Sequence, residues 1–330
     1  MARYAFFFEV LLNDFPDMAG RALDHHHFFS DRKIVFVLAT LCCLLWGSSY
    51  PAIKNGFAMF AIQPGDMAGK LVFAGWRSML AGMVLLCVAV LSKKNILALS
   101  RENWLEVGAL GLLQTSIMFV FFYLGLAYTT GVKSSVLNGT VSFFGVLLAH
   151  FIYHNDRLTW AKSLGCLVGF SGVLVVNFNH DLLDFSFALI GEGSMILSAF
   201  FMAAGMIYGK RVSRHMDSSL MTGYQLAFGG AVLLAVGVAM GGELARVTLK
   251  SSLILGYLVL NSSVAYTLWS VLLKYNRVGM VSVFNFLVPI FGAILSAVFL
   301  GETFLEWKNL AALLLVCVGI WLVTLEKKRQ

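Results

Sequence analysis

The chain has 330 residues, of which 59% are hydrophobic and 12% are charged, and its mean hydropathy is +0.82. Soluble domains carry about 25% charged residues, so this composition excludes an ordinary soluble protein and indicates an integral membrane protein. The net charge of +7 comes from Lys and Arg scattered between apolar runs, not from one basic face, which argues against nucleic-acid binding.

The first 32 residues precede any run long enough to cross a membrane. The segment 4–12, YAFFFEVLL, is short and contains Glu9, and no small-residue cleavage site follows it, which argues against a signal peptide. We expect residues 1–32 to form a cytoplasmic tail, and a misassigned start and a short interfacial segment are both open interpretations. The run His25–His27 is expected to belong to this polar tail and not to hold a metal.

Ten apolar windows follow, each near the length of about 20 residues that a helix needs to cross a bilayer. The loops between them are too short to hide a soluble domain. The sequence therefore predicts an all-α membrane protein with ten transmembrane helices, at residues 33–53, 71–91, 104–126, 133–153, 160–177, 188–209, 219–240, 252–273, 280–300 and 307–325.

The distribution of Lys and Arg predicts the orientation of these spans. If the N-terminus is inside, 17 of the 24 Lys and Arg residues fall on the inner side and six on the outer side, while Arg77 lies within a span. Positive residues favour the cytoplasmic side of a membrane, so both termini are predicted to be cytoplasmic.

The chain contains a duplication with an offset of 147 residues. The segment 280–302, MVSVFNFLVPIFGAILSAVFLGE, aligns without gaps with residues 133–155, which places Asn138 under Asn285. Over 64 aligned positions around this segment, the two copies share 16 identities. Shared polar residues and glycines make chance similarity between apolar helices a poor explanation.

Two domains of five spans each follow from this duplication, at residues 33–178 and 188–326. Because each copy has an odd number of spans, the second copy enters the membrane from the opposite side, and we predict inverted repeats. At an offset of 148, the second span also matches the seventh, which places Arg77 opposite Gln225. Inverted repeats are typical of transporters, in which a site at the repeat interface opens to either side.

Four features together resemble the drug/metabolite transporter superfamily in its ten-span form with two EamA-like domains: the motif LLWGSSYPAIK at 44–54, Arg77, VPIFGAILSAVFLGE at 288–302, and the duplication. The resemblance implies a helix bundle in the cytoplasmic (inner) membrane of a bacterium, with a central cavity lined mainly by the first, third, fourth, sixth, eighth and ninth spans. It also implies export of amino acids or related metabolites, while other branches carry nucleotide sugars, sugar phosphates or choline. Ser142 stands where the second copy has Pro289, so we expect a straighter fourth span and unequal gating by the two halves.

Gln114 and Asn261 are the leading candidates for a substrate site. They are equivalent in the two copies, each lies about ten residues into its span, and each is followed by small hydroxyl side chains. A polar side chain at that depth needs a partner or a water-filled cavity. Hydrogen bonds that hold two helices together are an equally open interpretation.

Aromatic residues form a second group of candidates. Pro51 weakens the end of the first span and frees a carbonyl near Trp46, Ser49 and Tyr50. The rings of Trp46 and Tyr50 would attract a substrate ammonium by cation–π contact. Packing against lipid or neighbouring helices is the alternative. The remaining expected substrate-binding residues are Asn138, Tyr266, Trp269 and Asn285.

Three residues are candidates for coupling or gating. Arg77 lies near the outer end of its span, where it either binds an anion or extends to the membrane surface. Glu192 is expected about five residues into the sixth span, where a buried carboxyl would couple transport to protons; interfacial solvation is the alternative. Pro289 interrupts the ninth span and is expected to contribute to gating.

The sequence contains no P-loop, zinc-protease helix or nucleophile elbow, and the five Cys show neither metal nor disulfide spacing, so we expect no enzyme activity, cofactor or metal. We predict a secondary transporter that works by alternating access and exports amino acids or related small polar metabolites. Uptake of a quaternary ammonium or other small cation is the alternative carrier, and a passive channel is the alternative from another class. The expected partners are a small-molecule substrate, the lipid bilayer and, as an open option, coupling protons, in a monomer or homodimer.

Overall fold

The computed structural model describes residues 26–96, 99–128, 131–176, 189–300 and 307–324, and within these ranges the chain forms helices and no strand. Most of the predicted tail, residues 1–25, lies outside the described residues, as does Glu302. The helices in chain order are α3 (Arg32–Met59), α4 (Met67–Leu91), α5 (Arg101–Gly111), the π-helix η1 (Leu112–Ile117), α6 (Met118–Tyr128), α7 (Gly131–Asn138), α8 (Thr140–Ile152), α9 (Trp160–Val176), α10 (Glu192–Val212), α11 (Ser218–Ala239), α12 (Leu249–Tyr275), α13 (Val278–Ser282), the 3-10 helix η3 (Val283–Phe286), α14 (Leu287–Leu300) and α15 (Trp307–Thr324).

Six helical segments are long and apolar enough to cross a membrane: α3, α4, the continuous run from α5 to α6, α10, α11 and α12. Shorter apolar helices account for the other four predicted windows. Each of the ten windows lies along one helix or along consecutive helices. This length and composition are those of a multi-pass membrane protein.

Side-chain caps begin several of the long helices. Asp31, Asp66 and Asp217 accept hydrogen bonds from backbone N–H groups in the first turns of α3, α4 and α11. Thr248 and Ser251 form a reciprocal capping box at the start of α12. The first N–H groups of a helix have no partner inside it, so polar residues that flank each apolar run fix where the helix starts.

Three of the predicted spans change helix type or break along their length. η1 separates α5 from α6, and η3 precedes α14, where Pro289 sits in the first turn and its missing N–H costs no helical hydrogen bond. The fourth span lacks this proline but is interrupted as well, since α7 ends and α8 begins around Gly139, whose N–H donates to the Val136 carbonyl at 3.0 Å. The fourth span is therefore also divided, although it lacks the proline.

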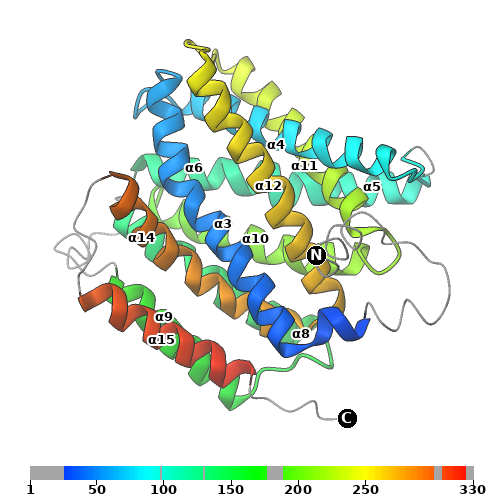
Figure 1. The fold of residues 1–330 in the computed structure, drawn as a ribbon, viewed down its shortest axis with the longest axis vertical. Coiled ribbons are helices and arrows are strands. Elements are labelled where there is room, and N and C mark those ends of the chain that lie inside the picture. Colours follow the sequence, from blue (N-terminus) through cyan, green and yellow to red (C-terminus); the bar gives the residue numbers. More distant parts are fainter. Residues whose placement is uncertain (1–25, 97–98, 129–130, 177–188, 301–306, 325–330) are drawn as a thin grey trace, which may run out of the picture.

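The main helix pairs join the first half of the chain to the second. In Figure 1, α3 crosses the bundle between α12 and α14, and α9 lies alongside α15. α4 packs along α11, and α10 packs against α6 and α8. The two halves are thus interleaved and share one interface.

Glycines allow the closest of these contacts, and the contacts come in matching pairs. On the α4–α11 interface, Gly82 lies against the backbone of Ala227, and Gly230 lies against that of Met79, so that a Cβ at either glycine would fall 2.3 Å from a backbone nitrogen. These two contacts are equivalent at the offset of 148. On the α9–α15 interface, Gly172 meets Val316 and Gly319 meets Gly169, a pair that is equivalent at the offset of 147.

Candidate functional site

A cavity of about 1150 Å³ lies among α3, α4, α6, α7, α8, α10, α12 and the η3–α14 segment. Its mouth lies at the connection between α3 and α4, where the exposed residues Ala61, Gln63 and Pro64 line it. Ligand pockets of about 300 to 1000 Å³ hold drug-sized molecules, so this cavity has room for a small organic solute and water.

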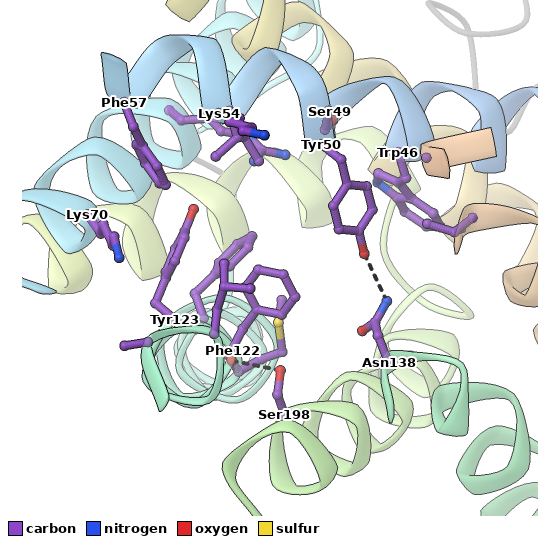
Figure 2. Close-up of a pocket in the computed structure, with 18 of the residues that line it drawn as sticks. Trp46, Ser49, Tyr50, Lys54, Phe57, Lys70, Phe122, Tyr123, Asn138 and Ser198 are labelled. Carbon is purple, nitrogen blue, oxygen red and sulfur yellow. Dashed lines mark hydrogen bonds between the residues drawn. The ribbon is translucent and has the colours of Figure 1, made fainter. Parts of the chain in front are cut away.

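One face of α3 supplies much of the cavity wall. Trp46, Tyr50 and Lys54 follow one another at intervals of four residues, and Ser49 and Phe57 lie beside them. Side chains at this spacing share one face of a helix. Figure 2 shows this face opposite the aromatic residues of α6.

An aromatic cluster surrounds the inner part of this wall. The Trp46 ring makes an edge contact with Tyr266, at 5.6 Å between ring centroids, and lies 4.9 Å from the Trp269 ring. Tyr266 lines the cavity, whereas Trp269 is behind this layer and donates its indole N–H to Met206 Sδ at 3.1 Å. The buried Trp46 Nε1 has no hydrogen-bond partner among the described residues.

The equivalent residues Asn138 and Asn285 both line the cavity. Asn138 Nδ2 donates to the Tyr50 hydroxyl at 3.3 Å, which links α7 to α3 (Figure 2). Asn285 Nδ2 donates to the Ser282 carbonyl at 3.1 Å. Each amide thus retains an oxygen that can accept a hydrogen bond from a solute.

Three basic side chains line the cavity: Lys54 on α3, and Lys70 and Arg77 on α4. Lys54 is exposed, while Lys70 is buried, donates to the Pro64 carbonyl and lies over the Phe57 ring at 5.9 Å. The described lining residues include no Asp or Glu. The lining of the cavity therefore carries a net positive charge.

Arg77 is 4% exposed, so it lies inside the bundle and does not extend to the membrane surface. Its Nε donates to the Ser262 hydroxyl at 2.9 Å, and its guanidinium lies 5.9 Å from the Phe119 ring centroid. These contacts fix one edge of the guanidinium. The two terminal nitrogens remain available to bind a planar anion in bidentate fashion.

Gln114 and Asn261, the leading candidates from the sequence, do not line the described cavity. Gln114 Oε1 accepts from Gln225 Nε2 at 2.8 Å, which joins η1 to α11. Asn261 Nδ2 donates to the Leu45 carbonyl at 2.7 Å and to Ser48 Oγ at 3.1 Å, which joins α12 to α3. The depth of a residue along a span does not tell whether its side chain faces the cavity or a neighbouring helix. The structure places both amides between helices.

The candidates for coupling and gating also separate. Pro289 lines the cavity, close to Asn285 in the chain. Glu192 does not line it and is the first residue of α10, not several residues into that helix as expected. A carboxylate at a helix N-terminus is favoured by the helix dipole, which is a structural reason for an acid at this position.

The structure adds cavity residues that the sequence reading missed. Lys54 and Lys70, expected from the sequence only as charges of the outer loops, line the cavity. Tyr123, which points from α6 toward α3 in Figure 2, lines it as well. A signal was present for the lysines, because Lys54 lies one helical turn after Tyr50 and Lys70 lies two turns before Arg77.

At the end of the bundle away from the mouth, a buried carboxylate links the two halves of the chain, and further polar bonds lie beside it. Asp156 Oδ2 accepts from the Gly279 N–H at 2.8 Å, and Asp156 Oδ1 pairs with Lys162 Nζ at 2.7 Å. Asp156 and Lys162 are both 2% exposed. Nearby, Lys210 Nζ donates to the Leu273 carbonyl at 2.8 Å. These bonds attach the α8–α9 connection and α10 to the α12–α13 region.

Comparison with known proteins identifies the class of this site. A solved crystal structure superposes with a TM-score of 0.73 at 17% identity, over 89% of this chain and 98% of the other, which shows the fold alone. An uncharacterised transporter of Bacillus subtilis, YvbV, is 27% identical over 89% of this chain and 92% of its own length. An uncharacterised transporter of Archaeoglobus fulgidus is 27% identical over 81% and 89%, and a WAT1-related chloroplast protein of Arabidopsis thaliana is 26% identical over 84% and 66%.

The model of the EamA-like transporter family matches the chain twice, at residues 33–178 and 189–325. This confirms the resemblance that the first-span and ninth-span motifs indicated, and it identifies the protein as a transporter and not an enzyme. The chain belongs to the EamA-like transporter family.

Proposed function

We propose that this protein is a secondary active carrier that works by alternating access and exports amino acids or related small metabolites across the inner membrane of a bacterium. The observation that carries the proposal is a cavity with its mouth at one end of the bundle, while a buried hydrogen bond between the two halves lies at the other end. A carrier in one of its end states has this arrangement.

Reciprocal contacts support the proposal that two inverted five-helix repeats form the bundle. Ser116 Oγ donates to the Gly229 carbonyl at 2.9 Å, and the equivalent Ser263 Oγ donates to the Ala81 carbonyl at 3.0 Å. The bond between Gln225 and Gln114 has its counterpart in the bond between Arg77 and Ser262, one residue from the exact equivalent of Gln114. Each half therefore holds the other in the same way.

The proposed orientation assigns the two ends. With cytoplasmic termini, the α3–α4 connection is outside, so the cavity faces outward and the Asp156 contacts close the cytoplasmic end. Exchange of the two halves' conformations would close the mouth and open that end. The two halves would not close the cavity with the same contacts. The residues equivalent to Asp156 and Lys162 are Thr303 and Asn309, which cannot form the same ion pair. Unequal gating remains part of the proposal on this ground.

The cation-uptake alternative loses support from the charges in the cavity. Aromatic faces attract a cation by about 0.5 to 2 kcal/mol. One Lys or Arg at about 6 Å repels it by about 3 kcal/mol at an effective dielectric constant of about 20. Repulsion by the three basic residues therefore outweighs the aromatic attraction. An amino acid or related metabolite is retained as the proposed solute because its carboxylate would suit the Arg77 guanidinium.

Counterflow in proteoliposomes tests the proposal. Vesicles preloaded with unlabelled solute should accumulate the same labelled solute transiently, with saturation, for at least one member of a panel of amino acids and related metabolites. Phe122→Ala, which changes the cavity wall, should alter the apparent affinity, whereas Phe151→Ala, at a site that is 73% exposed, should not. Flux that is neither saturable nor stimulated by solute on the opposite side would indicate a channel and overturn the proposal.

A further inference from the structure

We propose that the cavity selects solutes of net negative charge, and that Arg77 binds their carboxylate or phosphate group. This inference rests on the proposed carrier function and specifies the substrate class of the same cavity. It places anions above zwitterions of the same size, and it excludes cations.

Basic side chains dominate the charge of the cavity lining. Lys54, Lys70 and Arg77 line the cavity, and none of the described lining residues is acidic. Asp66 lies one turn before Lys70 and offsets part of its charge, and its carboxylate also caps α4 by accepting the Gly69 N–H at 2.8 Å. The described lining residues offer no acidic partner to Lys54 or Arg77. A solute that enters this space without a negative charge leaves the basic side chains uncompensated.

The buried guanidinium of Arg77 has a neutral hydrogen-bond partner among the described residues. A guanidinium stays protonated, and a buried charge in a membrane protein requires a partner. The side-chain partner of Arg77 in the described part of the chain is the neutral Ser262 hydroxyl, through Nε. A carboxylate or phosphate on the two terminal nitrogens would supply the missing charge and use the fork geometry that distinguishes Arg from Lys.

The basic residues lie one after another along the cavity, from the mouth inward. Lys70 lies beside the α3–α4 connection at the mouth, and Arg77 lies seven residues further along α4, or about 10 Å at 1.5 Å per residue. Figure 2 places Lys54 on the facing helix α3. A cleft lined by one sign of charge concentrates ions of the opposite sign, so these residues lead an anion inward.

The neutral groups explain why a zwitterion should bind less well. Trp46, Tyr50 and Tyr266 offer aromatic rings, and Asn138 and Asn285 offer amide oxygens. These groups suit an apolar or aromatic body. An ammonium would find only neutral acceptors among three cations, so its charge adds repulsion that the amide oxygens do not offset.

Ligands that share one body and differ in charge test this inference. Binding to the purified protein in nanodiscs is measured by thermal stabilisation for 3-phenylpropionate and phenyl phosphate (anions), phenylalanine (zwitterion) and phenethylamine (cation). We expect one of the anions to bind about tenfold more tightly than phenylalanine, and phenethylamine not to bind. Equal binding of anion and cation, or tighter binding of the cation, would overturn the inference, as would a panel in which neither anion binds.

Variants assign the effect to Arg77. Arg77→Gln should weaken anion binding by about 30-fold, and Arg77→Lys, which keeps the charge and loses the fork, should weaken it less. Lys250→Gln, an exposed lysine outside the cavity, should stay within about twofold of the unsubstituted chain. If Arg77→Gln fails to fold, Lys54→Gln at an exposed cavity position replaces it, and unchanged anion preference in the folded variant contradicts the inference.

The outcomes separate the inference from the carrier proposal. Selective anion binding without counterflow of any anion would retain the substrate class and reject the carrier. Counterflow of a cation or of phenylalanine, with no preference for the anions, would retain the carrier and reject the substrate class.

Discussion

The contact between Asp156 and Gly279 should hold the cytoplasmic end of the protein closed, and breaking it should shift the conformational equilibrium. Asp156 Oδ2 accepts the Gly279 N–H at 2.8 Å, and this bond crosses from the first half of the chain to the second. The bond to Lys162 lies within the first half, so it persists in either state. Of these two bonds of Asp156, the one to Gly279 is therefore lost when the end opens.

The size of the shift follows from that one bond. A buried hydrogen bond to a charged group contributes about 1.5 to 3 kcal/mol. Its loss in Asp156→Ala should move the ratio of outward-facing to inward-facing protein by roughly tenfold to hundredfold toward the inward-facing state. The double variant Asp156→Ala with Lys162→Met also removes the buried charge of Lys162, which loses its carboxylate partner in the single variant, and should give the same shift in a more stable protein.

Thiol labelling measures this shift. Phe57→Cys, in a background without the five native Cys, reports access from the mouth to a membrane-impermeant maleimide. The labelling rate should fall several-fold when Asp156→Ala is added, and it should not change with Glu102→Gln, an exposed acid on the same predicted side. An unchanged labelling rate in a variant with an unchanged melting temperature would refute the role given to this bond.

Three further predictions concern packing and the cavity wall. Gly82→Val should lower stability by about 3 kcal/mol or more in thermal unfolding, because its Cβ would meet backbone at 2.3 Å; Gly256→Val, with nothing within 4 Å, should cost far less, and equal losses would contradict this account of the α4–α11 interface. Gln114→Leu and Asn261→Leu should each lower stability by about 1 to 3 kcal/mol and leave the KM for the solute within about twofold; a large KM change at unchanged stability would restore them to the substrate site. Trp46→Phe should raise the KM about fivefold by removing part of the ring that lines the cavity, whereas Trp321→Phe, at an exposed position, should have no effect; equal KM values for the two variants would contradict a contact between Trp46 and the solute.

Hydrophobicity and repetition were enough to predict where the helices lie. Each apolar window falls on a helix, and the Asn138–Asn285 equivalence identified two residues that line one cavity. Trp46 and Tyr50, which belong to the proline-containing motif, line this cavity as well. These features depend on local sequence and on spacing, which a single chain displays.

Facing toward the cavity could not be predicted in the same way. Gln114 and Asn261 lie at the expected depth, but the rotation of each helix against its neighbours decides whether an amide meets a solute or another helix. Lys54 and Lys70 were not predicted to line the cavity, because a lysine near the end of a span was interpreted as a loop charge that sets the orientation of the protein. The interruption at Gly139 escaped prediction because no proline marks it.

The central claim is that one cavity opens to one side of the membrane at a time, and paired spin labels test it most directly. One pair, at Gln63 and Ala127, reports the mouth, and a second pair, at Asn155 and Arg277, reports the opposite end. With a transported solute under turnover conditions, we predict a population in which the first pair is closer and the second pair is further apart. A population in which both ends are open together, or distances that never change in opposite directions, would contradict alternating access.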